Sequence, residues 1–152
     1  MYVTNTKLML THYIIYGLSG LLLETFWTGF GSLFSGDISL TSRTYLWMFF
    51  IYGLGVFFEP IHDRIRRENF FIRGLIWVSL IYLIEFSTGF FLDKVVGACP
   101  WNYLTKTKFT LFGYIRFDYF PAWFIAGLLF EKYHDFLDKK VFNKDKKNES
   151  ME

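Results

Sequence analysis

The sequence predicts an all-α, polytopic membrane protein, a bundle of four transmembrane helices. Apolar residues make up 53% of the 152 residues and aromatic residues 23%. A water-soluble domain of this length has too little interior to bury so many rings, whereas a bilayer allows the outer surface of the helices to be apolar as well. The net charge of +2 is too small to favour nucleic acid as a partner.

Four long apolar stretches supply the helices. They predict spans at about residues 9–33, 44–62, 72–92 and 119–137. Crossing the hydrocarbon core takes roughly 20 residues, and each stretch reaches that length only if the span includes one glutamate. The fourth stretch is the most polar, so an interfacial helix is the alternative for it. The spans define a transmembrane domain over 1–137, and the charged tail over 138–152 is expected to be disordered.

The basic residues indicate an orientation. Of the 16 Lys and Arg residues, 11 fall on the side of the N-terminus, the loop between the second and third spans, and the C-terminal tail, which leaves 5 on the other side. Loops rich in Lys and Arg stay cytoplasmic, so both termini are predicted to be cytoplasmic in a multi-pass protein of the cell membrane. Arg64, Arg66 and Arg67 are interpreted as topology determinants that contact anionic lipid. The connection that contains CPWNY is expected outside, as irregular structure.

Two sequence patterns recur. The second and fourth spans share G-x-x-F-E-x-x-H-D, over Gly55–Asp63 and again over Gly127–Asp135. The first and third spans share a looser pattern, over Glu24–Phe30 and Glu85–Phe90. Because two helices return the chain to its starting orientation, these patterns indicate a tandem parallel repeat of two helices.

Each predicted span contains one glutamate, and these are Glu24, Glu59, Glu85 and Glu131. In three of the four spans a glycine precedes the glutamate by four residues, on the same helix face. A small residue there lets another helix come close. His62 and His134 follow Glu59 and Glu131 by three residues. A carboxylate that faces lipid is costly, so we expect the acids to point toward partners, protons or water.

Three functions are compatible with the candidate residues Glu24, Glu59, Glu85, Glu131, His62 and His134. The first is a polar site within the membrane that binds a substrate, a cation or a proton, in the permease-like component of a transport system. The second is a metal-dependent membrane enzyme, because Glu, Glu-x-x-His, Glu, Glu-x-x-His over four helices is the ligand pattern of di-iron bundles and suits a divalent metal as cofactor. The third is a scaffold for partner membrane proteins.

The depth of the glutamates favours the first function. With each span centred in the bilayer, Glu24 and Glu85 lie toward the outer side, and Glu59 and Glu131 toward the inner side. At 1.5 Å per residue the two levels are roughly 5–12 Å apart. Ligands of one metal converge to about 2 Å from it, so two levels favour a pathway or two separate sites.

Motifs for nucleotide binding or hydrolysis are not found in the sequence. It has no phosphate-binding glycine loop, no Ser-His-Asp arrangement and no CxxC pair. No catalytic residue is assigned, and a transport system would need a separate ATPase chain or other membrane subunits as partners. Cys99 is the single cysteine and cannot form an internal disulfide. His12 is expected to be an interfacial residue at the start of the first span.

A family resemblance rests on four stretches, IYGLSGLLLETFWTG, LTSRTYLWMFFIYGLGVFFEP, LIYLIEFSTGFFLDKVVGACPWNY and FPAWFIAGLLFEKY. They resemble the putative ABC-transporter type IV family of small bacterial membrane proteins and a related group of four-span animal proteins. The resemblance covers about residues 12–134, and its most specific parts are E-F-x-T-G and C-P-W-N-Y. It implies that the family pattern includes Glu24, Glu59, Glu85, Glu131, Gly89, Cys99, Pro100 and Trp101, whereas the histidines match less firmly. The family name implies a permease component of a transport system.

Overall fold

The computed structural model describes residues 6–139, which are mostly helical. The α-helices are α1 (Thr6–Phe34), α2 (Leu46–Gly53), α3 (Glu59–Ile65), α4 (Phe70–Val95) and α5 (Phe120–Leu137), with 3-10 helices η1 (Leu54–Phe58) and η2 (Phe117–Tyr119). Strands β1 (Thr110–Leu111) and β2 (Ile115–Arg116) form a small antiparallel hairpin. The predicted all-α class is confirmed. Most of the predicted tail, residues 140–152, lies outside the described residues.

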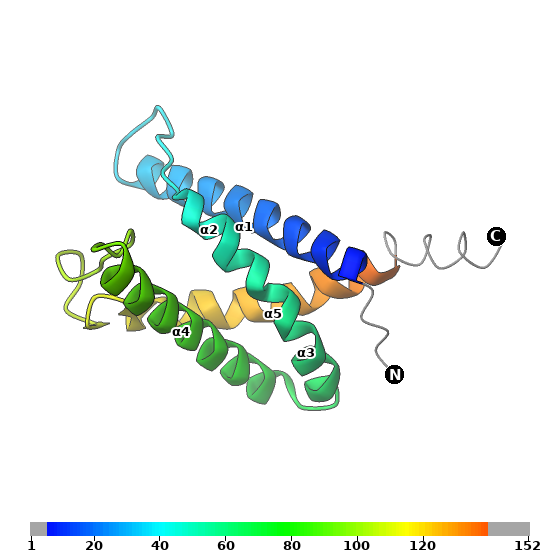
Figure 1. Cartoon of the computed structure of the whole chain (residues 1–152). Coiled ribbons are helices and arrows are strands. Elements are labelled where there is room, and N and C mark those ends of the chain that lie inside the picture. Colours follow the sequence, from blue (N-terminus) through cyan, green and yellow to red (C-terminus); the bar gives the residue numbers. More distant parts are fainter. Residues whose placement is uncertain (1–5, 140–152) are drawn as a thin grey trace. The chain divides into compact units, whose positions relative to one another are not determined.

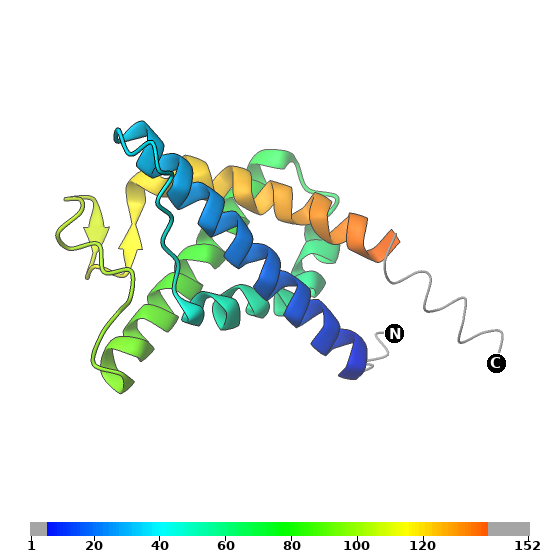
Figure 2. The same cartoon turned by 90° about the horizontal axis from the view of Figure 1, so that it is seen from above.

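The chain divides into two compact units, the first ending at Ile61 and the second beginning at His62, within α3. In the first unit α1 packs against α2 and η1 (Figure 1). In the second unit α4 packs against α5, and the hairpin lies between the end of α4 and the start of α5 (Figure 2). Each unit is therefore an antiparallel helix pair with its own connecting loop.

Among the described helices, one is both long and apolar enough to cross a membrane, and it is α4. The predicted four-span arrangement is thus not confirmed by helix length and hydropathy. The second predicted span is divided, so that α2 alone has 8 residues. In α5 the second half carries Glu131, Lys132 and Asp135, which lower its hydropathy.

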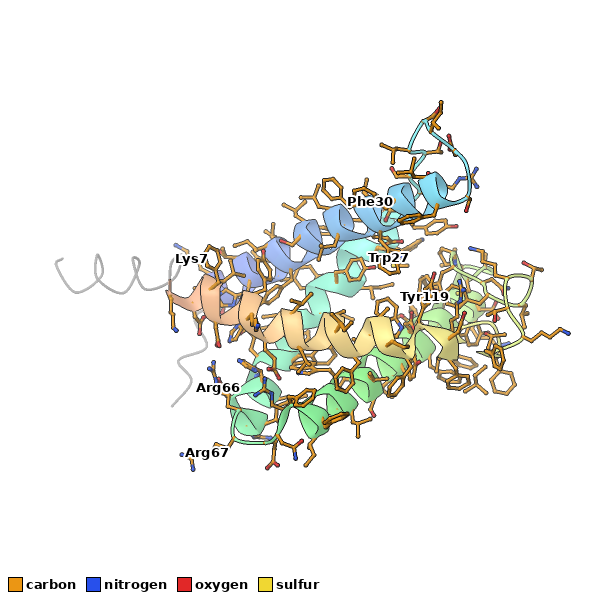
Figure 3. All side chains as sticks on the ribbon, turned by 180° about the vertical axis from the view of Figure 1, so that it is seen from behind. Lys7, Trp27, Phe30, Arg66, Arg67 and Tyr119 are labelled. Carbon is orange, nitrogen blue, oxygen red and sulfur yellow. The ribbon has the colours of Figure 1, made fainter. Side chains whose placement is uncertain are left out.

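Large apolar side chains nevertheless cover the outside of both units. Trp27 and Phe30 project from α1 and are 59% and 53% exposed (Figure 3). Leu83 and Phe91 are similarly exposed on α4. In water, apolar area costs about 25 cal/mol per Å², and extended apolar patches promote association. The exposed surface of both units is therefore suited to an apolar environment rather than to water.

A proline explains why the second predicted span is not one regular helix. Pro60 has no N–H to donate to the carbonyl of Val56, and its ring crowds that carbonyl. The chain adopts the tighter 3-10 form over Leu54–Phe58, just before the proline, and returns to α-helix at Glu59. Distortions of this kind are expected next to proline.

Glycines mark the places where the helices of each unit approach one another. A Cβ atom at Gly20 would overlap the ring of Tyr52, and one at Gly127 would overlap the side chain of Trp77. The expectation that these glycines face another helix is therefore confirmed. In contrast, a Cβ atom at Gly31 would meet open space.

Gly127, which contacts another helix, and Gly31, which faces open space, make a matched pair of tests. We expect Gly127→Ala to destabilise the α4–α5 pair by about 1–3 kcal/mol, because Trp77 must move to admit the methyl group. The same change at Gly31, also inside a helix, should be neutral or slightly stabilising, since alanine favours helix over glycine. Thermal unfolding of both variants in mild detergent measures the difference. Equal melting temperatures would contradict the close approach at Gly127.

Candidate functional site

In the first unit, Glu59 accepts two hydrogen bonds from α1. His12 Nδ1 hydrogen-bonds with Glu59 Oε1, and the Tyr16 hydroxyl donates to the same oxygen at 3.0 Å. His12 and Tyr16 are each 4% exposed and lie four residues apart, on one face of α1. The expectation that His12 is an interfacial residue stays a prediction, and the structure adds that its side chain contacts Glu59. Its imidazole is buried because it compensates a carboxylate that burial would otherwise destabilise.

In the second unit, Glu131 on α5 is bound by two donors from α4. The Trp77 indole N–H donates to Glu131 Oε1 at 2.6 Å, and Arg73 Nη2 lies 2.6 Å from Oε2. Arg73 Nε also donates to Oε1, at 3.2 Å. Glu131 is 3% exposed and Trp77 1%. Both carboxylate oxygens are thus engaged by the charged Arg73, which is a strong type of hydrogen bond.

The two arrangements have the same geometry, which we call a glutamate clasp. Two donors four residues apart on the first helix of a unit bind one glutamate from a later helix of the chain. Arg73 and Trp77 occupy the places in the second clasp that His12 and Tyr16 occupy in the first. One displacement along the sequence relates His12 to Arg73, Tyr16 to Trp77 and Glu24 to Glu85.

Glu24 and Glu85 lie further along the same first helices. Each comes eight residues after the second clasp donor, which is about 12 Å along the helix axis. The Tyr52 hydroxyl donates to Glu24 Oε2 at 3.0 Å. The two acids of each unit therefore lie at two levels, as the spacing in the sequence predicts.

Glu85 is less completely bonded than the other acids. The Trp123 side chain lies beside its carboxyl group, but the pair falls short of hydrogen-bond geometry. Glu85 Oε2 and Trp123 Nε1 are consequently buried without a hydrogen-bond partner in the described part of the chain. Within residues 6–139, neither Glu24 nor Glu85 forms an ion pair with Lys, Arg or His.

The glycine that precedes a glutamate by four residues has a specific role in both units. The Tyr52 ring lies against Gly20 while its hydroxyl donates to Glu24. Trp77 lies against Gly127 while its indole N–H donates to Glu131. The G-x-x-x-E pattern thus provides space for an aromatic side chain and, one turn later, an acceptor for its polar atom.

The two candidate histidines lie near Glu131 in the second unit. His62 Nδ1 is 3.8 Å from Glu131 Oε1, and its Nε2 is 3.2 Å from Asp135 Oδ1. The His62 and His134 rings pack edge to face, with centroids 5.4 Å apart. Asp135 also binds Arg66, which lies with Arg67 at the turn before α4 (Figure 3). The arginine counted as a topology determinant therefore also joins this network.

A metal does not fit the contacts within either unit. A metal ion at Glu131 would have to displace Arg73 and Trp77 from both of its oxygens. Glu24 lies about 12 Å along α1 from Tyr16, which binds Glu59, whereas the ligands of one ion lie within about 2 Å of it. The acids of one unit can instead form charged or neutral hydrogen bonds at two separate levels.

The CPWNY segment packs on the end of α4. A Cβ atom at Gly89 would lie 3.1 Å from Tyr114 and 3.3 Å from Trp101. The Trp101 indole N–H donates to the Tyr114 carbonyl at 3.2 Å, and the Tyr114 hydroxyl donates to Asp93 at 2.9 Å. Cys99 is buried beside them, and burial raises the pKa of its thiol. The thiol is therefore suited to packing rather than to nucleophilic chemistry.

The first unit holds its loop in a similar way. The backbone N–H of Arg43 donates to Thr28 Oγ1 at 3.1 Å, and a Cβ atom at Gly29 would lie 3.3 Å from the Leu40 carbonyl oxygen. The glycine of the Thr-Gly pair that follows Glu24 and Glu85 in the sequence thus contacts the connecting loop in each unit.

Sequence reasoning missed the partners of the glutamates: His12, Tyr16, Tyr52, Arg73, Trp77 and Trp123. A usable signal was present, because both first helices carry two polar donors four residues apart, near the end that begins the unit. It was hidden by the abundance of aromatic residues, since the chain has 10 Tyr and 5 Trp.

A double-mutant cycle tests the second clasp. We expect Arg73→Met to destabilise the protein by about 3 kcal/mol, because it leaves the buried Glu131 carboxylate without its charged partner. Adding Glu131→Gln should recover much of this loss, since the neutral amide still accepts from Trp77. Unfolding of the three variants in detergent gives the coupling energy. Simple additivity of the two substitutions would show that Arg73 and Glu131 do not interact.

Comparison with known proteins places these contacts in a family. No solved structure matches the chain. The sequence model of the family described as "Putative ABC-transporter type IV" matches residues 11–150, a range that contains both clasps, both Thr-Gly pairs and the CPWNY segment. The family name and the apolar helix α4 together fit a membrane protein related to ABC transporters. The chain belongs to the putative ABC-transporter type IV family.

Proposed function

We propose that the chain is a membrane-embedded, permease-like component of a transport system, with four membrane-crossing segments and cytoplasmic termini in the cell membrane. The family name, the span-length helix α4 and the exposed apolar surface of both units support this assignment. The sequence contains no phosphate-binding glycine loop, so a separate ATPase chain is the expected partner.

The observation that carries the proposal is the difference between the two kinds of glutamate. Glu59 and Glu131 are bound by two donors each, which suits a role in holding helix pairs together. Glu24 accepts from the hydroxyls of Tyr52 and Thr44, and Glu85 lies beside Trp123. In the described residues neither acid pairs with Lys, Arg or His. Intramembrane acids without a charged partner are typical of substrate, ion or proton pathways. We assign substrate or ion contact to Glu24 and Glu85, and helix pairing to Glu59 and Glu131.

A tandem repeat of two helices is part of the proposal. Its support is that equivalent contacts recur at equivalent places: a glutamate clasp, an acid about 12 Å further along the first helix, and a glycine after a threonine that contacts the loop. Parallel repeats of this type are known in transporter folds. His62 and His134 add a polar network at Glu131 and are assigned to its support rather than to a metal.

Reporter fusions test the topology. Fusions at Glu68, in the basic loop before α4, should report a cytoplasmic location, and fusions at Ser39 or Thr105 an external one, because basic loops stay inside. Cytoplasmic signal at all three positions would exclude four spans. Because Glu68 and Thr105 lie on either side of α4, it would also mean that α4 does not cross the membrane, which would remove the permease proposal.

Purification of the tagged full chain from its native membranes tests the function. We expect an ATPase chain to co-purify, and the hydrolysis by the complex to fall at least about tenfold in the Glu24→Gln, Glu85→Gln variant, since a lost interaction of 1.4 kcal/mol already gives a factor of ten. Co-purification should persist, because neither residue belongs to a clasp.

Ser87→Ala is the matched control, since Ser87 is an exposed residue two positions from Glu85. It should leave hydrolysis unchanged. Undiminished hydrolysis in the double glutamate variant would reject the role of these acids, and failure of any ATPase to co-purify would reject the transport-system assignment.

A further inference from the structure

The loop between α4 and α5 displays apolar side chains on an ordered hairpin. Phe109, Phe112 and Phe117 are 67%, 70% and 47% exposed. Lys106 and Lys108 are exposed beside them. Such a combination of exposed rings and cations is typical of segments that lie in a membrane interface.

Several backbone groups of the hairpin are hydrogen-bonded within the protein and would keep these bonds outside water. The Tyr114 N–H donates to the Leu111 carbonyl at 3.0 Å, and the Phe117 N–H donates to the Phe109 carbonyl at 2.8 Å. The Gly113 carbonyl accepts from the Tyr103 N–H at 2.9 Å, and the Tyr114 carbonyl accepts from Trp101. Irregular backbone at membrane depth is tolerated when its polar groups are satisfied by the protein in this way.

The turn places a phenylalanine where another residue type is usual. Phe112 and Gly113 occupy the central positions of the turn, with φ of 53° and 79°. Turns with two positive φ values favour Asn, Asp or Gly at the first central position. A bulky residue in the left-handed region is strained, and strain of this kind points to function. Folding of the hairpin alone gives no reason for a phenylalanine at this position.

The tip of the hairpin lies at a depth that a segment inserted from the membrane surface can reach. α4 has 26 residues, or about 39 Å, and the hydrocarbon core is about 30 Å thick. Phe112 packs against Phe86, with ring centroids 6.4 Å apart. For a centred helix this contact lies about 10 Å inside the edge of the core, at the limit of the range that interfacial segments reach.

We propose that the exposed side of this hairpin, formed by Phe109, Phe112, Phe117, Lys106 and Lys108, is an interfacial membrane anchor. The rings insert among the acyl chains close to the headgroups, and the lysines contact anionic headgroups. The inference rests on the part of the proposed function that makes α4 a membrane span. The bilayer is favoured as the partner because the surface is continuous with the exposed apolar end of α4 at Phe90 and Phe91.

The test uses the full chain in vesicles of phosphatidylcholine, with and without phosphatidylglycerol. Phe112→Cys carries a polarity-sensitive NBD dye, and Glu68→Cys, in the exposed loop before α4, is the matched control. The unsubstituted chain is the labelling blank, because Cys99 is only 7% exposed. At position 112 we expect blue-shifted emission and at least about twofold more quenching by nitroxide lipids than at position 68.

Two further variants separate the parts of the anchor. Phe112→Gly should fold normally, because glycine suits the positive φ, and a dye at Phe109→Cys should then become more accessible to aqueous iodide. Lys106→Gln with Lys108→Gln should remove any increase in lipid quenching that phosphatidylglycerol causes. Such an increase is the expected signature of anionic headgroup contact.

Equal quenching by iodide at positions 112 and 68 would place the hairpin in water and overturn the anchor. A blue-shifted dye that nitroxide lipids do not quench would instead mean a protein partner, and would overturn it as well. Carbonate extraction separates this inference from the proposed function. A chain that resists extraction while its hairpin stays in water refutes the anchor alone, whereas a chain that is extracted refutes the membrane span and the anchor together.

Discussion

A carboxylate within an apolar helix pair must receive hydrogen bonds from the neighbouring helix, and the arrangement of each unit follows from this constraint. Leaving Glu131 buried and unpaired would cost several kcal/mol, so Arg73 and Trp77 have to face it together. Their spacing of four residues fixes the rotation of α4 about its axis. Gly127 then fixes the distance between the helices, because Trp77 reaches Glu131 only by lying where a larger side chain would stand. One polar contact thus determines both the face and the separation of the pair.

The sequence made the acceptors of these contacts visible but not the donors. A glutamate in an apolar stretch is rare, so Glu24, Glu59, Glu85 and Glu131 could be identified directly, and the preceding glycines indicated their helix faces. Tyr52 and Trp77 look like any other aromatic residue in a chain with 20 Phe, 10 Tyr and 5 Trp. His12 was assigned by its position near the helix start, and only the fold brings Glu59 to it. The 3-10 segment was predictable in principle, because Pro60 removes a specific hydrogen-bond donor.

In the proposed function, one acid of each unit pairs the helices and the other contacts the ligand. A carboxylate bound by an arginine or a histidine is stabilised in place and has few free lone pairs. A carboxylate that meets only neutral groups, as Glu24 meets two hydroxyls and Glu85 an indole, keeps acceptor capacity for a transient ligand. Glu24 and Glu85 lie about 12 Å further along their helices than the donors that bind Glu59 and Glu131. A ligand could therefore be exchanged at Glu24 or Glu85 without breaking the contact that holds the helix pair together.

The loop after α4 links this arrangement to the surface of the second unit. Gly89 lies one helical turn after Glu85, on the same face of α4, and contacts Trp101 and Tyr114 from the loop. The loop is therefore anchored just beyond the least completely bonded acid, whose neighbour Trp123 lies near the start of α5. A change at Gly89 would alter the loop and the surroundings of Glu85 together. This placement gives a physical reason for a glycine in the E-F-x-T-G motif and for the tryptophan in C-P-W-N-Y, since each is needed for the other to pack.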